Sequence, residues 1–76
     1  MKELINRIAK ALVDYPDQVS LNEIKGHRLV VYELKVAKSD IGKIIGKQGR
    51  NADAIRAILK AVAGKARKQV LLEMVE

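Results

Sequence analysis

Cysteine is absent from this chain, and histidine, proline and aromatic residues are scarce. Without thiols there is no disulfide frame and no thiolate metal site, and the single histidine does not form a zinc site alone. Two tyrosines are the only aromatic residues, which disfavours modules that stack bases on aromatic platforms. No apolar run approaches the ~20 residues of a membrane span, and the N-terminus has no apolar signal core. We therefore expect a cytoplasmic protein.

The sequence also lacks any combination of residues that is typical of a catalytic site. No serine has a histidine base in a plausible arrangement, and the carboxylates are scattered, so the sequence predicts a non-enzymatic protein without a cofactor. The 76 residues allow a single domain over residues 1–76. A core of this size rarely supplies more than ~3–5 kcal/mol of stability without a metal, a disulfide or a partner.

Positive charge is what the chain has in excess, and it is concentrated in the central part. The 15 Lys and Arg residues outnumber nine Asp and Glu residues, for a net charge of +6. Residues 38–68 contain nine basic and two acidic residues, a net of +7, whereas the rest of the chain has a net of −1. Such a concentration indicates a surface for a polyanion, with a solvated basic face as the alternative.

Apolar periodicity predicts a helix and two strands in the first half of the chain. Spacings of three and four residues indicate a helix over residues 2–14, which ends before Pro16. Alternating apolar residues indicate strands over residues 19–25 and 29–37, joined by a tight turn at Gly26. These two strands are expected to form a hairpin.

The second half of the chain predicts two helices and a last strand. We expect Ser39 to cap a short helix that Gly46 stops. A longer helix begins just past Gly49 and ends at Ala63, with Gly64 in the left-handed position beyond it. Its expected core-facing residues are Ile55, Ile58, Leu59 and Val62. Alternation then predicts a final strand over residues 70–74.

The element order α-β-β-α-α-β restricts the topology. A strand, two helices and another strand suit a right-handed crossover, which makes the last strand parallel to the preceding one. The predicted fold class is therefore α+β, with a three-stranded mixed sheet and the helices packed on one face.

The segment IIGKQGR at residues 44–50 joins the two central helices. Two glycines three positions apart allow close backbone approach, and the next helix presents free N–H groups and the positive end of its dipole. Helix N-termini of this kind bind phosphate oxygens, and Lys47 and Arg50 add cations beside them. The alternative is a helix-turn-helix corner that needs glycine only for its geometry. A Walker A loop is excluded because Gly42 and Gly46 are too close together, and no G-x-G-x-x-G motif is present.

Residues 44–50, followed by Ala54-Ile55-Arg56, resemble the signature of KH domains, and the preceding elements match the type II arrangement found in bacteria. Over essentially its full length the chain is similar to the KhpA (YlqC-like) family of small bacterial KH proteins. The resemblance implies binding of single-stranded RNA, with the loop clamping the backbone of about four nucleotides. It is compatible with a role as an RNA chaperone or a post-transcriptional regulator.

The same resemblance implies RNA contact by ten residues in three groups. The clamp consists of Gly46, Lys47, Gln48 and Gly49. The adjoining groove offers apolar contacts to bases from Ile41, Ile45 and Ala52, and positive charge comes from Lys43, Arg50 and Arg56.

The longer central helix also predicts self-association. Outside the core stripe it carries a second apolar face of mostly small residues: Ala54, Ala57, Ile58 and Ala61. Such a face suits packing against the same helix of a second copy around a two-fold axis, although alanines are also simply good helix formers. The resemblance implies the same, because KhpA-family proteins form homodimers and pair with a larger KH-containing partner, KhpB, also called Jag or EloR.

Two other functions stay open at this point. A protein-interaction module, such as a heterodimer adaptor, would dock its basic helices on another polypeptide and contact RNA only incidentally. A DNA-binding helix-turn-helix over residues 39–63 would read bases with Arg50, Asn51 and Asp53 at the start of its second helix.

Overall fold

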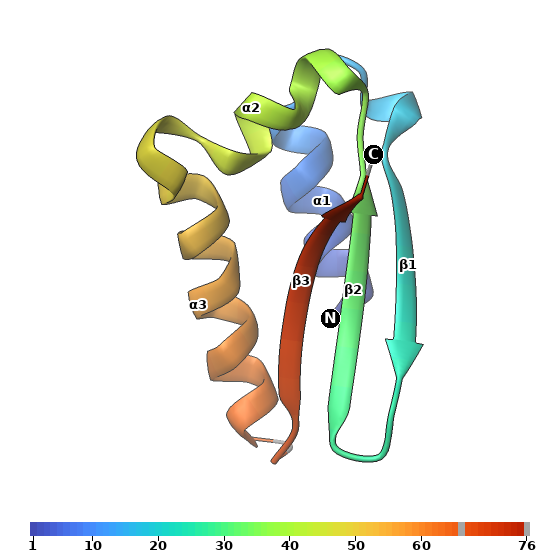
Figure 1. The fold of residues 1–76 in the computed structure, drawn as a ribbon, viewed down its shortest axis with the longest axis vertical. Coiled ribbons are helices and arrows are strands. Elements are labelled where there is room, and N and C mark those ends of the chain that lie inside the picture. Colours follow the sequence, from blue (N-terminus) through green and yellow to red (C-terminus); the bar gives the residue numbers. More distant parts are fainter. Residues whose placement is uncertain (66, 76) are drawn as a thin grey trace.

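The structure, a computed structural model, describes residues 1–65 and 67–75 and has the predicted order of elements (Figure 1). The helices are α1 (Lys2–Leu12), α2 (Ile41–Ile45) and α3 (Arg50–Lys65), and the strands are β1 (Ser20–Lys25), β2 (Leu29–Lys35) and β3 (Gln69–Val75). Short 3-10 turns cover Pro16–Gln18, Lys38–Asp40 and Lys47–Gly49. Within the described ranges, each helix is too short or too polar to cross a bilayer.

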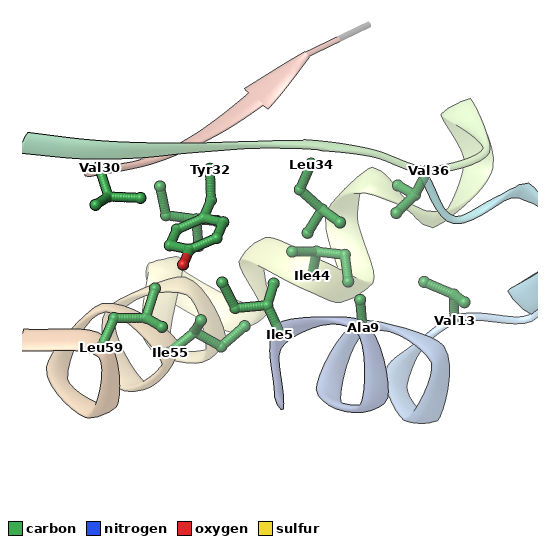
Figure 2. Close-up of a cluster of buried hydrophobic side chains, with 11 residues drawn as sticks. Ile5, Ala9, Val13, Val30, Tyr32, Leu34, Val36, Ile44, Ile55 and Leu59 are labelled. Atoms are coloured by element: carbon green, nitrogen blue, oxygen red, sulfur yellow. The ribbon is translucent and has the colours of Figure 1, made fainter. Parts of the chain in front are cut away.

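The three strands form one mixed sheet in the order β1-β2-β3. β1 pairs with β2 antiparallel, and β2 pairs with β3 parallel through the crossover that α2 and α3 supply. Figure 2 shows α1, α2 and α3 all on the same side of the sheet, which leaves the other face without helices. The predicted α+β fold with helices on one face is confirmed.

The core lies between the central strand and the helices (Figure 2). Val30, Tyr32 and Leu34 alternate along β2 toward the helices and are all buried, because successive strand residues point to opposite faces. The helices meet them with buried residues at helical spacing: Ile5 and Ala9 from α1, Ile44 from α2, and Ile55 and Leu59 from α3. The buried Ile44 anchors α2, although this helix is only five residues long.

The start of α2 differs from the prediction. Ser39 does not cap the helix, because it lies inside a 3-10 turn and the capping position belongs to Asp40. The Asp40 side chain does not make the usual cap hydrogen bond. The Asp40 carboxylate instead accepts hydrogen bonds from the end of α1, a long-range partner that local sequence does not reveal.

The end of α3 also differs, since Gly64 lies inside the helix and the left-handed residue is Arg67, at φ 55°. The N–H of Lys68 donates to the carbonyl of Ala63 at 3.1 Å, and the N–H of Arg67 donates to that of Gly64 at 3.2 Å. This pair of bonds is a Schellman motif, which closes the helix without glycine in the left-handed position. The prediction that Gly64 ends the helix is therefore wrong.

Two residues expected in the core stripe of α3 lie outside it. Ile58 and Val62 are each 43% exposed, whereas Ala63 is 2% exposed. Buried positions in α3 are mainly four residues apart, so Ala63 continues the stripe from Ile55 and Leu59 and Val62 falls to one side of it.

Candidate nucleic-acid interface

The loop between α2 and α3 has an unusual backbone, because three of its four residues have positive φ. The φ angle is 75° at Gly46, 58° at Gln48 and 76° at Gly49. An added Cβ at Gly46 would lie 2.6 Å from the Cγ of Asn51, whereas one at Gly49 would meet nothing within 4 Å. Gly46 is therefore required both by conformation and by space, and Gly49 by conformation alone.

α3 begins at Arg50, directly after this loop (Figure 1). The N–H groups of its first turn have no carbonyl partner within the helix, and the dipole of the 16-residue helix adds partial positive charge at this end. The sequence therefore folds so that the glycine loop and a helix N-terminus share one corner of the molecule. Such a corner attracts phosphate oxygens.

Lys47 and Arg50 are the cations of this corner. Both side chains are exposed, and neither takes part in an ion pair with the residues that the structure describes. Arg56, one and a half turns into α3, lies 3.8 Å from an Asp53 oxygen and 3.5 Å from the carbonyl oxygen of Leu72. An exposed pair such as Arg56–Asp53 is worth only ~0–1 kcal/mol, so Arg56 stays available to an anion.

Lys43 is placed differently from these cations, because two carboxylates hold it. Its ammonium group donates a hydrogen bond to Asp14 and lies 3.5 Å from Asp40 Oδ1. The hydrogen bond to Asp14 raises the pKa of Lys43. The charge of Lys43 is thus balanced within the protein, which weakens the expectation that it attracts RNA.

Asp40 is completely buried behind Lys43. Its carboxylate accepts hydrogen bonds from the backbone N–H groups of Asp14, at 3.1 Å, and Tyr15, at 3.0 Å. Burial raises the pKa of Asp40, but these bonds and the charge of Lys43 outweigh burial, and the pKa lies below its ordinary value of 3.8. Asp40 therefore ties the end of α1 to the start of α2 and fixes where the glycine loop begins.

The Asp40→Asn variant is expected to melt more than about 8 °C below the wild type at pH 7, because an amide nitrogen cannot accept the second backbone hydrogen bond. Since the folded pKa of Asp40 is depressed, its contribution is present above the unfolded pKa of about 3.9 and is lost as pH falls through the folded pKa. The wild type should therefore lose more stability than the variant between pH 5 and about pH 2.

Thermal melts followed by circular dichroism over this pH range measure both effects. Asp14→Asn is the control, because it removes only an exposed partner of Lys43 and keeps both backbone bonds. An Asp40→Asn protein that melts with the wild type at pH 7 would contradict the structural role of Asp40.

The three residues expected to contact bases offer very different amounts of surface. Ile45 is 39% exposed, Ile41 is partly buried, and Ala52 is only 5% exposed. Apolar surface beside the loop is therefore provided mainly by Ile45, because Ala52 is buried on the inner side of the first turn of α3.

A pocket of about 310 Å³ lies between the last turns of α3 and the start of β3. In Figure 1 these two segments meet at the other end of α3 from the glycine loop. Its lining residues are Lys60, Ala63, Gly64, Lys68, Gln69, Val70 and Leu71. β3 is an edge strand, so alternate residues leave N–H and C=O groups unpaired on its free side. The sequence analysis missed this pocket, because only the fold places β3 beside α3.

The outer face of α3 agrees with the predicted second apolar face. Ala54, Ala57, Ile58 and Ala61 are all exposed, and Val62 adjoins them. This face points away from the core stripe that the helix packs against the sheet.

Comparison with known proteins places the chain clearly. The model of the family described as "KhpA/KhpB, KH domain" matches residues 2–74. The RNA-binding protein KhpA of Caldanaerobacter subterraneus subsp. tengcongensis is 57% identical, covering 99% of this chain and 100% of that protein. KhpA of Clostridium acetobutylicum is 52% identical with the same coverage, and KhpA of Chlamydia trachomatis serovar D is 51% identical, covering 100% of this chain and 97% of that protein.

Among solved structures, the chain resembles Era, crystallised in complex with MgGDPNP and nucleotides 1506–1542 of 16S ribosomal RNA. The TM-score is 0.58 at 23% identity, and the match covers 96% of this chain but 28% of the Era chain. This likeness supports the type II KH fold that the element order and the sheet topology indicate. On the family match and the full-length relatives together, the chain belongs to the KhpA/KhpB family of KH-domain proteins.

Proposed function

We propose that the chain is a non-enzymatic module that binds single-stranded RNA. The observation that carries this proposal is the meeting of the Gly46–Gly49 loop, the N-terminus of α3 and the two exposed cations Lys47 and Arg50 at one corner. Phosphate oxygens of an RNA backbone accept hydrogen bonds from such amides and neutralise such cations. The names of the relatives as RNA-binding proteins support the same function.

From the clamp, the strand would run along α3 toward β3. Ile45 offers apolar surface beside the loop, Arg56 lies midway, and the pocket near Val70 lies at the far end. α3 spans about 24 Å, which leaves room for a short stretch of extended strand. We propose that about four nucleotides occupy this path and that unpaired backbone groups of β3 contact base edges.

A helix-turn-helix DNA reader fits the observations less well. α2 has only five residues, and the connection to α3 has left-handed φ at three positions rather than the geometry of a packed corner. Arg50 and Asp53 are exposed at the start of α3, but Asn51 is engaged with the carbonyl of Lys43. A module that binds only protein would not need a glycine loop with exposed cations at the N-terminus of a helix.

The finer biological role extends this proposal. We infer a cytoplasmic RNA chaperone or post-transcriptional regulator that works as a homodimer through the outer face of α3. A heterodimer with a larger KH-containing partner of the KhpB type is the alternative assembly, and the family that unites KhpA and KhpB domains supports it.

Fluorescence anisotropy with a labelled single-stranded RNA tests the function. If Lys47, Arg50 and Arg56 neutralise about three phosphates, the logarithm of the binding constant falls with the logarithm of salt concentration at a slope near −2. Unlabelled single-stranded RNA should displace the probe, whereas an equal amount of duplex DNA should not. A slope near zero, or displacement by DNA first, would overturn the proposed function.

A further inference from the structure

Asn51 lies between the last turn of α2 and the glycine loop. Its Nδ2 donates a hydrogen bond to the carbonyl oxygen of Lys43 at 2.9 Å. This carbonyl is one of the last in α2, and Gly46 turns the chain away at φ 75° before the helix can continue and supply an N–H partner. A side chain of α3 therefore completes the end of α2, across the loop that separates the two helices.

The same side chain packs against the loop backbone. The space in which a Cβ at Gly46 would lie is bounded by Asn51, at 2.6 Å from its Cγ, 2.8 Å from its Cβ and 2.9 Å from its backbone nitrogen. Asn51 is only partly exposed, unlike its neighbours Arg50 and Asp53. Its amide thus faces the loop and α2, while the cations of the clamp face solvent.

We propose that Asn51 is a positioning residue of the RNA clamp, acting through the loop rather than by touching RNA. The inference rests on the proposed function, because it concerns the same site. A clamp binds well only if the loop cation and the first N–H groups of α3 point to the same phosphate before RNA arrives. Three of the loop residues have left-handed φ, and few backbone bonds hold the loop. The Gly46 N–H donates to the Gly42 carbonyl at 2.8 Å, the Gly49 N–H donates to the Gly46 carbonyl at 3.1 Å, and the Arg50 N–H donates to the Lys47 carbonyl. The Asn51 amide adds a second link to α2, which starts from α3 rather than from the loop itself.

The Asn51→Leu variant tests this role, because leucine is uncharged and branches at Cγ like asparagine but cannot donate the hydrogen bond. We expect its affinity for single-stranded RNA to fall about five- to tenfold, since the loop is no longer preorganised. The salt slope should stay at the wild-type value, because no cation is lost. Asn22→Leu is the matched control: Asn22 bonds to Glu33 on the sheet, far from the loop, and its replacement should leave RNA affinity unchanged.

A double-mutant cycle separates positioning from direct contact. If Asn51 acts through the loop, Asn51→Leu costs little in a protein that already carries Lys47→Met, so the two losses do not add. Additive losses would mean that Asn51 touches RNA itself and would overturn the proposal. In the free protein, amide chemical shifts in nuclear magnetic resonance spectra should change most at Gly46 and Gly49, before any RNA is added.

Other outcomes are equally decisive. A wild type that does not bind RNA overturns the proposed function, while the spectra of the free protein still test whether Asn51 orders the loop. A wild type that binds RNA and an Asn51→Leu protein that binds equally well overturn only the role of Asn51. Should Asn51→Leu fail to fold, Asn51→Ala removes the same hydrogen bond with less bulk beside Gly46 and gives the same comparison.

Discussion

The double variant Lys47→Asp, Gln48→Asp is expected to bind single-stranded RNA at least tenfold more weakly than the wild type, a loss of about 1.4 kcal/mol or more. The two substitutions remove a cation of the clamp and set two anions beside the backbone phosphates. Both glycines remain, so the loop keeps its course. The left-handed backbone at position 48, with φ 58°, suits aspartate, which tolerates this region better than most residues. We therefore expect the fold to survive and the binding to fail.

The measurement is RNA affinity by fluorescence anisotropy, together with circular dichroism melts of the same samples. Lys10→Asp, Gln18→Asp is the matched control, because it makes the same change in net charge at two exposed positions outside α2, the loop and α3. The control should lose far less affinity, through long-range charge alone. Equal loss in both proteins would mean that net charge governs binding, and unchanged affinity in a folded clamp variant would contradict the proposed RNA clamp.

Most of the fold could be predicted from the sequence because its signals are local. Apolar residues alternate along β2, and Ile5 and Ala9 lie one helical turn apart in α1, so these patterns predict the buried face of each element. The right-handed crossover rule predicts that β3 pairs parallel to β2. Gly46 and Gly49 marked the loop, and both have the positive φ that glycine favours. These features need no information about distant parts of the chain.

The mistaken predictions share a physical cause. Ser39 is a good capping residue, but the fold places the carboxylate of Asp40 against the end of α1, 25 residues away, and α2 starts from that contact. Gly64 is a good helix terminator, but the Schellman bonds form at Lys68 instead. In both places a local preference worth about 1 kcal/mol is overridden, by the long-range contact of Asp40 in the first case and by the backbone bonds of Arg67 and Lys68 in the second.

Lys43 and Asn51 show how the same limit affects a functional site. Counting charges treats Lys43 like Lys47, yet Asp14 and Asp40 reach it from 29 residues and three residues away. A pattern of residue types assigns Asn51 to base reading, yet its amide bonds to the backbone of the preceding helix. Residue types therefore locate the proposed phosphate-binding corner, while only the fold separates cations that are available from those already paired.

A second large effect is expected at the outer face of α3, where we propose that two copies of the chain meet. A single charge on this face should convert the dimer into monomers. Ala54, Ile58 and Ala61 recur at three- and four-residue spacing along an exposed apolar strip that Val62 widens. A two-fold axis near the middle of this strip would bring Ala54 of one copy against Ala61 of the other, and small residues at both positions allow close approach. Pairing would add stability to a small core and place two clamps on one particle.

We expect the wild type to be a dimer and the Ala61→Asp variant to be a folded monomer, because the interface would bury one unpaired carboxylate from each copy. Sedimentation equilibrium at tens of micromolar measures the mass of each protein, and circular dichroism checks that the variant folds. Ala11→Asp is the matched control, since it adds the same charge on the exposed side of α1 and should stay dimeric. If the wild type sediments as a monomer, or if Ala61→Asp remains a dimer, the outer face of α3 is not where two copies meet. If the dimer does dissociate, the loss of avidity should weaken binding to long RNAs that span two clamps more than binding to short ones, because each clamp itself is untouched.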